Sequence, residues 1–350
     1  MASPLSLEDL SFILAKTQHL WREMRGQRVF VTGGTGFFGC WLVESFLHAN
    51  RSLDLGASAT LLTRDPAAFV RKCPHLASDP AITLLAGDVV DFPFPDGEFK
   101  YVIHAATETS AKRAAENPLG LLSCILRGTE RVLEFAASHG AQKLLLTSSG
   151  AVYGKQPADV THLPESFPGA PDPLDCASAY AEGKRAAEMM CSVYGAKFGI
   201  ECKIARCFAF VGPHLPLDAH FAIGNFIRDA MTGAAIEVKG DGTAKRSYLY
   251  AADLAVWLWT ILFEGGQMEA FNVGSEQALS ILELAQTVAE ALESPAKVHV
   301  AQQAVPGADL QQYVPSTRKA EQVLGLKCEV ALQDAIQRTA DWYRTPGNRG

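Results

Sequence analysis

The fold is decided by residues 28–39, whose sequence is RVFVTGGTGFFG. The apolar start of this stretch predicts a buried strand, and the residues after the glycines predict a helix. Gly33 permits a tight turn, Gly36 lets a ligand approach the backbone, and Gly39 lets the helix pack closely on the strand. The free N–H groups at the start of that helix favour a phosphate. The turn therefore predicts a dinucleotide site, and we expect these residues to line it: Gly33, Thr35, Gly36, Phe37, Phe38 and Gly39.

Short apolar runs continue to alternate with helical periodicity after this turn. Further strands are expected at 59–63, 82–86, 101–105, 143–148 and 201–207, and helices at 37–48, 118–138 and 180–194. Continuously apolar strands separated by helices are typical of a parallel sheet that is covered on both faces. The sequence therefore predicts an α/β fold with a doubly wound, Rossmann-like parallel sheet and a smaller C-terminal substrate-binding lobe.

The chain divides into four expected parts. Residues 1–26 form an amphipathic N-terminal helix that is capped at Ser6 and runs to about Arg25. Residues 27–210 form the nucleotide-binding domain. Residues 211–343 form mainly the substrate-binding lobe, although some of its segments are expected to return to the first domain. Residues 344–350 form a frayed tail.

Composition excludes several classes of protein. The 350 residues include 31 Lys and Arg and 38 Asp and Glu, so a net charge of −7 predicts no binding to nucleic acid or to an anionic membrane. No apolar run reaches the roughly 20 residues of a membrane span, and the first residues do not resemble a signal peptide. The eight cysteines form no CxxC pair, which predicts no metal site, no disulfide framework and a cytoplasmic location.

The end of the second strand bears on the choice between NAD and NADP. NAD sites place an acid there to bind the ribose 2′-hydroxyl. This chain has Thr63 at that position, followed by Arg64, whose guanidinium suits a 2′-phosphate. We therefore favour NADP over NAD, although Asp65 leaves NAD open. Further along, Asp88 is placed to accept a hydrogen bond from the adenine amino group.

A catalytic set is expected at Ser149, Tyr180 and Lys184. Tyr180 and Lys184 are four residues apart and so lie on one face of a helix. An ammonium about 4 Å from a phenol, at an effective dielectric constant of about 20, favours the phenolate by at most about 4 kcal/mol, or almost three pKa units. Tyr180 is thus expected to act as general acid and base, Lys184 to lower its pKa and bind the cofactor ribose, and Ser149 to orient the reacting oxygen.

With these motifs the chain resembles the extended short-chain dehydrogenase/reductase family, in its nucleotide-sugar epimerase/dehydratase branch. The resemblance spans about residues 28–343 and includes VIHAA at 102–106 and LTSSGAVYG at 146–154. It implies that Val89, Ala105, Ala106 and Thr107 contact the cofactor. It also implies a substrate site for a nucleoside-diphosphate sugar, with Asn225 and Arg246 on the diphosphate and with Ser149 and Gly150 near the sugar.

The chain departs from the family pattern in three places. The family's 4,6-dehydratases have Asp-Glu directly after the catalytic hydroxyl and its decarboxylases have Ser-Glu, whereas this chain has Gly150–Ala151. The Asn expected three residues after Arg206 is replaced by Ala209. Glu108 is placed to enter the sugar pocket as an acid or base, which keeps a dehydratase of unusual type open.

These observations favour a nucleoside-diphosphate-sugar 4-epimerase, which oxidises C4 with bound NAD(P), lets the keto sugar rotate and returns the hydride. An epimerase needs no acid at the two positions after Ser149. The alternatives are an NADPH-dependent 4-keto-sugar-nucleotide reductase, an atypical dehydratase, or a non-catalytic NADP-binding sensor or scaffold. The resemblance also implies a homodimer, with the helices at 118–138 and 180–194 forming its interface.

Overall fold

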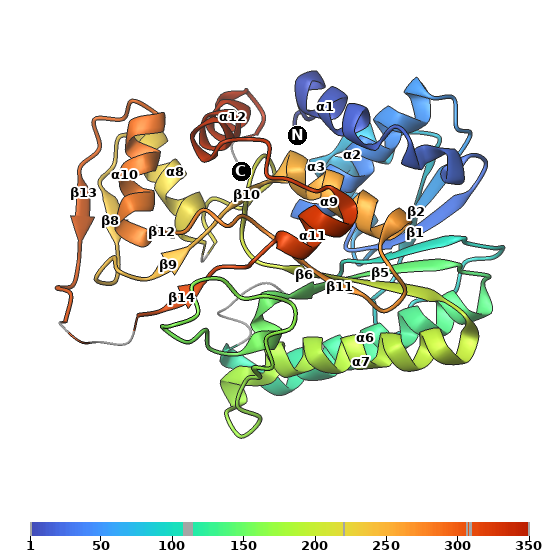
Figure 1. Ribbon diagram of the computed structural model, residues 1–350. Helices are drawn as coiled ribbons and strands as arrows, with labels where there is room; N and C mark the ends of the chain where they lie inside the picture. The colour runs from blue at the N-terminus through green and yellow to red at the C-terminus, as the bar shows by residue number, and fades with distance from the viewer. Residues whose placement is uncertain (1, 108–114, 220, 306, 308–309, 349–350) are drawn as a thin grey trace.

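A seven-stranded parallel sheet forms the centre of the protein (Figure 1). The computed structural model describes residues 2–107, 115–219, 221–305, 307 and 310–348. The strand order is β11-β6-β5-β4-β1-β2-β3, and all neighbours run parallel, which confirms the predicted fold class. The strands are β1 (Arg28–Thr32), β2 (Ser58–Thr63), β3 (Ile82–Ala86), β4 (Tyr101–His104), β5 (Lys143–Ser149), β6 (Glu201–Cys207) and β11 (Ala270–Val273).

The strand order places a ligand crevice beside the end of β1. The chain moves outward from β1 through β2 to β3 and then crosses to β4 on the other side of β1. In open parallel sheets, ligands bind where the order reverses, at the carboxyl ends of the strands. The turns that follow β1 and β4 therefore face this crevice.

Helices cover both faces of the sheet (Figure 1). Two long helices, α6 and α7, pack against each other on one face, while α2 and α9 pack on the other with α1 against them. Because α9 is buried along nearly its whole length, it is apolar on all sides. The helices packed around the sheet are α1 (Leu7–Thr17), α2 (Phe37–Ser52), α3 (Pro66–Lys72), α4 (Pro74–Ala77), α6 (Pro118–Ser138), α7 (Ala179–Phe198), α9 (Ala251–Glu264) and α11 (Arg318–Leu324).

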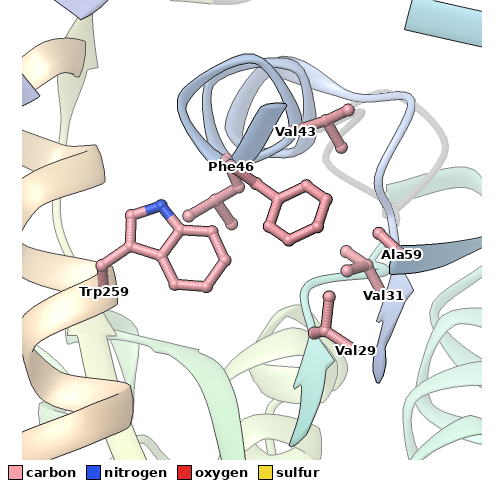
Figure 2. Close-up of a pocket in the computed structure, with 7 residues that line it drawn as sticks. Val29, Val31, Val43, Phe46, Ala59 and Trp259 are labelled. Atoms are coloured by element: carbon pink, nitrogen blue, oxygen red, sulfur yellow. The ribbon is translucent and has the colours of Figure 1, made fainter. Parts of the chain in front are cut away.

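Alternate residues of the central strand supply the two faces of the core. Phe30 points towards α6, where its ring lies 4.4 Å from that of Phe135, while Val29 and Val31 point towards α2. The α2 side contains a cavity of about 10 Å³ (Figure 2). Such a small apolar space offers water no polar partner, so it is a packing gap in a dry core. Its lining residues are Val29, Val31, Leu42, Val43, Phe46, Ala59 and Trp259.

A smaller lobe stands beside the sheet (Figure 1). It contains α8 (Ala222–Thr232), α10 (Ile281–Ala291), α12 (Leu332–Arg344), and the short strands β7 (Phe210–Val211), β8 (Ile236–Val238), β9 (Lys245–Arg246), β10 (Leu249–Tyr250), β12 (Leu279–Ser280), β13 (Val298–Val300) and β14 (Gln312–Tyr313). Strand β9 lies between β12 and β14, β8 pairs with β13, and β7 pairs with β10. Two elements after residue 210 belong with the main sheet instead: β11 is one of its strands, and α9 packs on its face.

The N-terminal helix is shorter than the sequence predicted. Ser6 caps α1 as expected, but α1 ends at Thr17 and is followed by a 3₁₀ segment at Leu20–Met24, so one helix running to Arg25 was wrong. Tertiary packing explains the break, because Trp21 is fully buried with its ring 4.7 Å from that of Trp259.

The described part of the C-terminal tail is docked, which corrects the expectation of a frayed end over residues 344–350. Asn348 is only 5% exposed. Its side-chain Oδ1 accepts a hydrogen bond from Ser3 N, and its side-chain Nδ2 donates to Trp342 O at 2.6 Å. The two ends of the chain therefore hold each other. Among the described residues, no helix has the length and apolarity needed to cross a membrane.

Candidate active site

The glycine turn between β1 and α2 leaves no room for side chains. Gly33 has a φ of +73°, and a Cβ there would stand 2.6 Å from the carbonyl carbon of Ala105. A Cβ on Gly39 would stand 2.3 Å from the oxygen of Gly33. Gly36 is the N-cap of α2 and brings no side chain to the free N–H groups of that helix. A bare backbone cradle at a helix N-terminus fits a pyrophosphate.

The segment after β4 forms the other side of the crevice. Thr32 Oγ1 lies 2.8 Å from His104 Nδ1 and accepts a hydrogen bond from Ala106 N at 3.1 Å. Burial lowers the pKa of His104 to about 3, so this ring is neutral at physiological pH. Thr107 Oγ1 is buried without a hydrogen-bond partner among the described residues. Buried hydroxyls are normally satisfied, so a ligand that bonds to Thr107 would complete this wall.

The residues after β2 place no described acid where an NAD ribose would sit. Thr63 is buried, and Arg64 is exposed. Asp65 caps α3 by accepting a hydrogen bond from Ala68 N at 2.8 Å, so its carboxylate is used by the helix.

The predicted adenine contacts lie after β3. Asp88 is half-buried and accepts a hydrogen bond from Val90 N at 3.1 Å, which forms a local turn. Val89 packs on α6, where a Cβ on Gly128 would stand 2.9 Å from its methyl group. Asp88 is thus held in a local turn after β3, and Val89 is packed on α6.

The three predicted catalytic residues come together at the end of β5. Ser149 is the last residue of β5, and its Oγ accepts a hydrogen bond from Ala151 N at 3.1 Å. Tyr180 and Lys184 lie in the first turns of α7, with the ammonium 6.0 Å from the centre of the tyrosine ring. Lys184 is 3% exposed and donates to Thr147 O at 2.9 Å. The phenol and the serine hydroxyl thus face the same small space.

The electrostatics of this set differ from the prediction. Burial raises the pKa of Tyr180 above its ordinary value, and hydrogen bonding to Ser149 opposes that rise. Lys184 was expected to lower the pKa of Tyr180, but its ammonium is directed to the carbonyl of Thr147 instead. Burial also lowers the pKa of Lys184 to about 8. The chain alone therefore keeps Tyr180 protonated at neutral pH.

Two aromatic residues that sequence reasoning missed complete the site. Tyr313 Oη lies 3.5 Å from Ser149 Oγ, and its ring centre is 4.6 Å from that of Phe208. A Cβ on Gly150 would stand 2.6–2.7 Å from three atoms of the Phe208 ring. The ring therefore occupies the space into which a side chain at position 150 would project. Neither residue belongs to a local motif, and no signal in the sequence pointed to them.

Of the two predicted diphosphate ligands, Arg246 lies near the catalytic residues, whereas the side chain of Asn225 is hydrogen-bonded to Ala219 and Arg228. Arg246 lies on β9 with its guanidinium 5.9 Å from the ring centre of Tyr313, which joins it to the catalytic group. Asn225 lies on α8, where its amide donates to Ala219 O at 2.9 Å and its oxygen accepts from Arg228. Glu108 lies outside the described residues.

Arg206 is engaged within the protein. Its guanidinium donates to both carboxylate oxygens of Glu188, at 3.0 and 2.7 Å, and also to Tyr153 Oη at 3.0 Å. This pair fixes β6 to α7 beside the site. Arg206 is therefore a structural residue.

A family model described as the NAD dependent epimerase/dehydratase family matches residues 29–274. The chain belongs to this family. A UDP-glucuronic acid decarboxylase from Arabidopsis thaliana is 31% identical over 318 residues, which cover 91% of this chain and 89% of that protein. A crystal structure of a UDP-glucose 4-epimerase from Thermus thermophilus, in complex with NAD, is 27% identical with a TM-score of 0.74 and covers 91% of this chain and all of that one.

The family is one of NAD-dependent enzymes that includes sugar-nucleotide epimerases, dehydratases and decarboxylases, and this protein is a member of it. A dTDP-glucose 4,6-dehydratase from Streptomyces venezuelae shares its fold, with a TM-score of 0.76 at 24% identity and coverage of 91% of this chain and 98% of that one. Because these relatives perform three different reactions, membership alone leaves the reaction of this protein open. The side chains around Ser149 must distinguish them.

Proposed function

We propose that the protein is a nucleoside-diphosphate-sugar 4-epimerase. The observation that carries this proposal is the pairing of Gly150 with Phe208 beside an intact set of Ser149, Tyr180 and Lys184. Decarboxylation or dehydration of the family's usual type calls for an acid after the catalytic hydroxyl. Here an aromatic ring covers Gly150, and the next residue is Ala151, so no proton carrier stands at either position.

The chain's own groups support oxidation at C4 followed by reduction on the opposite face. A nicotinamide cofactor held by the Gly33–Gly39 turn and by Thr107 would supply the hydride acceptor for oxidation at C4 and the hydride donor for the reduction. Tyr180, as phenolate, takes the proton of the C4 hydroxyl and gives it back in the second step, while Ser149 holds that oxygen by a hydrogen bond. Burial raises the pKa of Tyr180 and the Lys184 ammonium is directed to Thr147 O, so the positive charge of a bound, oxidised nicotinamide would be needed to favour the phenolate.

A decarboxylase is the second candidate, because UDP-glucuronic acid decarboxylases are about 30% identical to this chain. A 4-keto-sugar reductase is the third, since it needs no acid after Ser149. Purified enzyme incubated separately with UDP-glucose, UDP-N-acetylglucosamine and UDP-glucuronic acid distinguishes all three. We expect one sugar to equilibrate with its C4 epimer without carbon dioxide release and without net cofactor reduction. Carbon dioxide from UDP-glucuronic acid, or stoichiometric NADPH consumption with a 4-keto sugar, would overturn the proposal.

We also propose that the cofactor is NADP rather than NAD. The support is the exposed guanidinium of Arg64 after a buried Thr63, together with the use of Asp65 as a helix cap. Arg64→Ala is then expected to weaken NADP binding by roughly 10- to 150-fold, as for loss of one charge-assisted contact worth about 1.5–3 kcal/mol, and to leave NAD binding unchanged. Titration calorimetry with both nucleotides measures this. Tighter binding of NAD by the unmodified chain would reject the preference.

A further inference from the structure

A second cluster of reactive side chains lies on the other side of the glycine turn from the catalytic residues. The sulfur atoms of Cys40 and Cys73 and an imidazole nitrogen of His214 all lie within 4.8 Å of one another, and all three residues are buried. Cys40 is in the first turn of α2, Cys73 joins α3 to α4, and His214 follows β7. The proposed reaction uses none of them.

His214 gives an independent indication of a ligand. Its side chain is 0% exposed, yet Nδ1 has no hydrogen-bond partner among the described residues. An unpaired nitrogen on a buried imidazole is energetically costly, so its presence indicates a partner that the polypeptide does not supply. The backbone of His214 also has a φ of +69°, a conformation that residues other than glycine rarely adopt. The chain thus holds a buried imidazole, one nitrogen of which is unsatisfied, grouped with two buried thiols.

The other nitrogen of His214 has a fixed partner. His214 Nε2 lies 3.4 Å from Glu44 Oε1, which also lies 3.3 Å from His75 Nε2. The second oxygen of Glu44 accepts a hydrogen bond from Leu5 N at 2.7 Å. A carboxylate on one imidazole nitrogen is the usual support for a histidine that binds a metal through its other nitrogen.

We propose that Cys40, Cys73 and His214 Nδ1 bind a zinc ion, with Glu44 orienting the histidine. Two thiolates and one imidazole are donors that suit zinc, whereas harder cations such as magnesium and calcium prefer oxygen donors. Three protein ligands leave one position of a tetrahedral ion for a small ligand such as water. Binding releases the two thiol protons, so the affinity falls in acid.

A zinc ion here would fasten the nucleotide-binding turn from behind. Cys40 directly follows Gly39, and its sulfur lies 3.8 Å from Thr35 O within the turn. The ion would therefore join the start of α2, through Cys40, to the junction of α3 and α4 at Cys73 and to the turn before α8 at His214. We infer a structural role for this ion, because its ligands come from elements that contribute nothing to the set of Ser149, Tyr180 and Lys184.

The test is metal binding by the full-length protein, independent of activity. Protein that has been reduced, stripped with a chelator and dialysed against zinc is expected to retain one zinc per chain by elemental mass spectrometry. Cobalt in place of zinc is expected to give thiolate charge-transfer absorption and the visible bands of a tetrahedral ion. Cys73→Ser and His214→Ala should each abolish retention after dialysis.

The matched control is the double variant Cys191→Ser and Cys202→Ser, which removes the other buried, adjacent thiol pair and should retain full zinc binding. If Cys73→Ser and His214→Ala fail to fold, the cobalt spectrum of the unmodified chain decides. A reduced chain that retains no zinc, variants that bind as much as the unmodified chain, or a cobalt spectrum without thiolate bands would each overturn the proposal. Recovery of a Cys40–Cys73 disulfide together with no metal uptake would identify a redox pair instead.

Discussion

Gly150 shows how one residue without a side chain can limit the chemistry of a site. The Phe208 ring lies where a Cβ at this position would be placed, at 2.6–2.7 Å. The aromatic ring and the glycine therefore depend on each other. An acid could be introduced at position 150 only if the ring moved.

We predict that Gly150→Ala destabilises the protein by about 1–3 kcal/mol, which is the usual cost of overpacking. In a Phe208→Ala background, where the ring is absent, the same substitution should cost less than about 0.5 kcal/mol. Urea unfolding of the four proteins in this double-mutant cycle measures the coupling. Additive effects would show that the Phe208 ring does not confine Gly150.

Local motifs predicted the chemistry-bearing residues but not their surroundings. Gly33, Tyr180 and Lys184 were identifiable because fixed spacing on one turn or one helix face determines what each can do. Tyr313 joins Ser149 only after the chain has passed through the whole second lobe, and pairwise spacing carries no information about such contacts. The predicted lowering of the pKa of Tyr180 was wrong in direction for the same reason, since the burial that raises this pKa depends on residues distant in sequence.

At the scale of elements, a buried carboxylate connects α9 to the segment before α12. Asp253 is 1% exposed and accepts hydrogen bonds from Glu329 N and Val330 N, at 3.2 and 3.1 Å. Burial outweighs these bonds and raises the pKa of Asp253 to about 7. The folded chain therefore holds a proton here that the unfolded chain, with a pKa near 3.9, releases at lower pH.

This difference predicts how stability changes with pH. Between about pH 4 and pH 7 the folded state binds more protons at Asp253, so its contribution to stability falls as the pH rises, by up to about 4 kcal/mol over that range. Asp253→Asn should remove this fall. The free energy of unfolding of the variant, minus that of the unmodified chain, should therefore be larger at pH 8 than at pH 5. Urea unfolding of both proteins at the two pH values measures it. Parallel pH dependence would show that Asp253 does not titrate in this range.

Sequence patterns fixed some element boundaries and missed others. The spacing of Ser280 and Glu283 is that of a capping box, and it starts α10, because both of its hydrogen bonds are local. The end of α1 at Thr17 was missed, since Trp21 leaves helical geometry to pack on α9. The docking of Asn348 on Ser3 was also missed, because the partner lies at the opposite end of the chain.

At the scale of the whole molecule, α6, α7 and the segment before α7 carry several exposed large apolar side chains. Large side chains on and next to these helices are exposed by about half or more of their area, which is typical of an interface when they cluster on one surface. We propose that this face forms a homodimer. The exposed residues are Leu119, Leu174, Met189, Val193 and Phe198.

Light scattering is expected to give the mass of a dimer for the unmodified protein. Val193→Glu, which places a charge on this face, should shift the mass to that of a monomer, while Val323→Glu on α11, an equally exposed valine elsewhere, should leave it unchanged. A monomer at all concentrations for the unmodified chain would contradict the proposed dimer.

The class of the fold was predictable from the alternation of apolar strands and helices, and some segments after residue 210 were expected to return to the first domain, but which segments do so was not predictable. β11 pairs with β6 at the edge of the main sheet, although it lies far inside the C-terminal stretch. A run as short as AFNV at 270–273 predicts a strand without indicating which sheet it joins. That choice depends on packing over α9.

The most direct test of the proposed chemistry follows the hydrogen at C4. A UDP-hexose that carries deuterium at C4 is incubated with the enzyme, and the products are analysed by NMR. We predict an inverted C4 that retains its deuterium, with no carbon dioxide released, and a rate that falls about 10²- to 10⁴-fold in Tyr180→Phe, which keeps the fold but removes the acid–base group. Deuterium lost from C4, a product with unchanged C4 configuration, or a Tyr180→Phe variant of undiminished rate would contradict epimerisation through Tyr180.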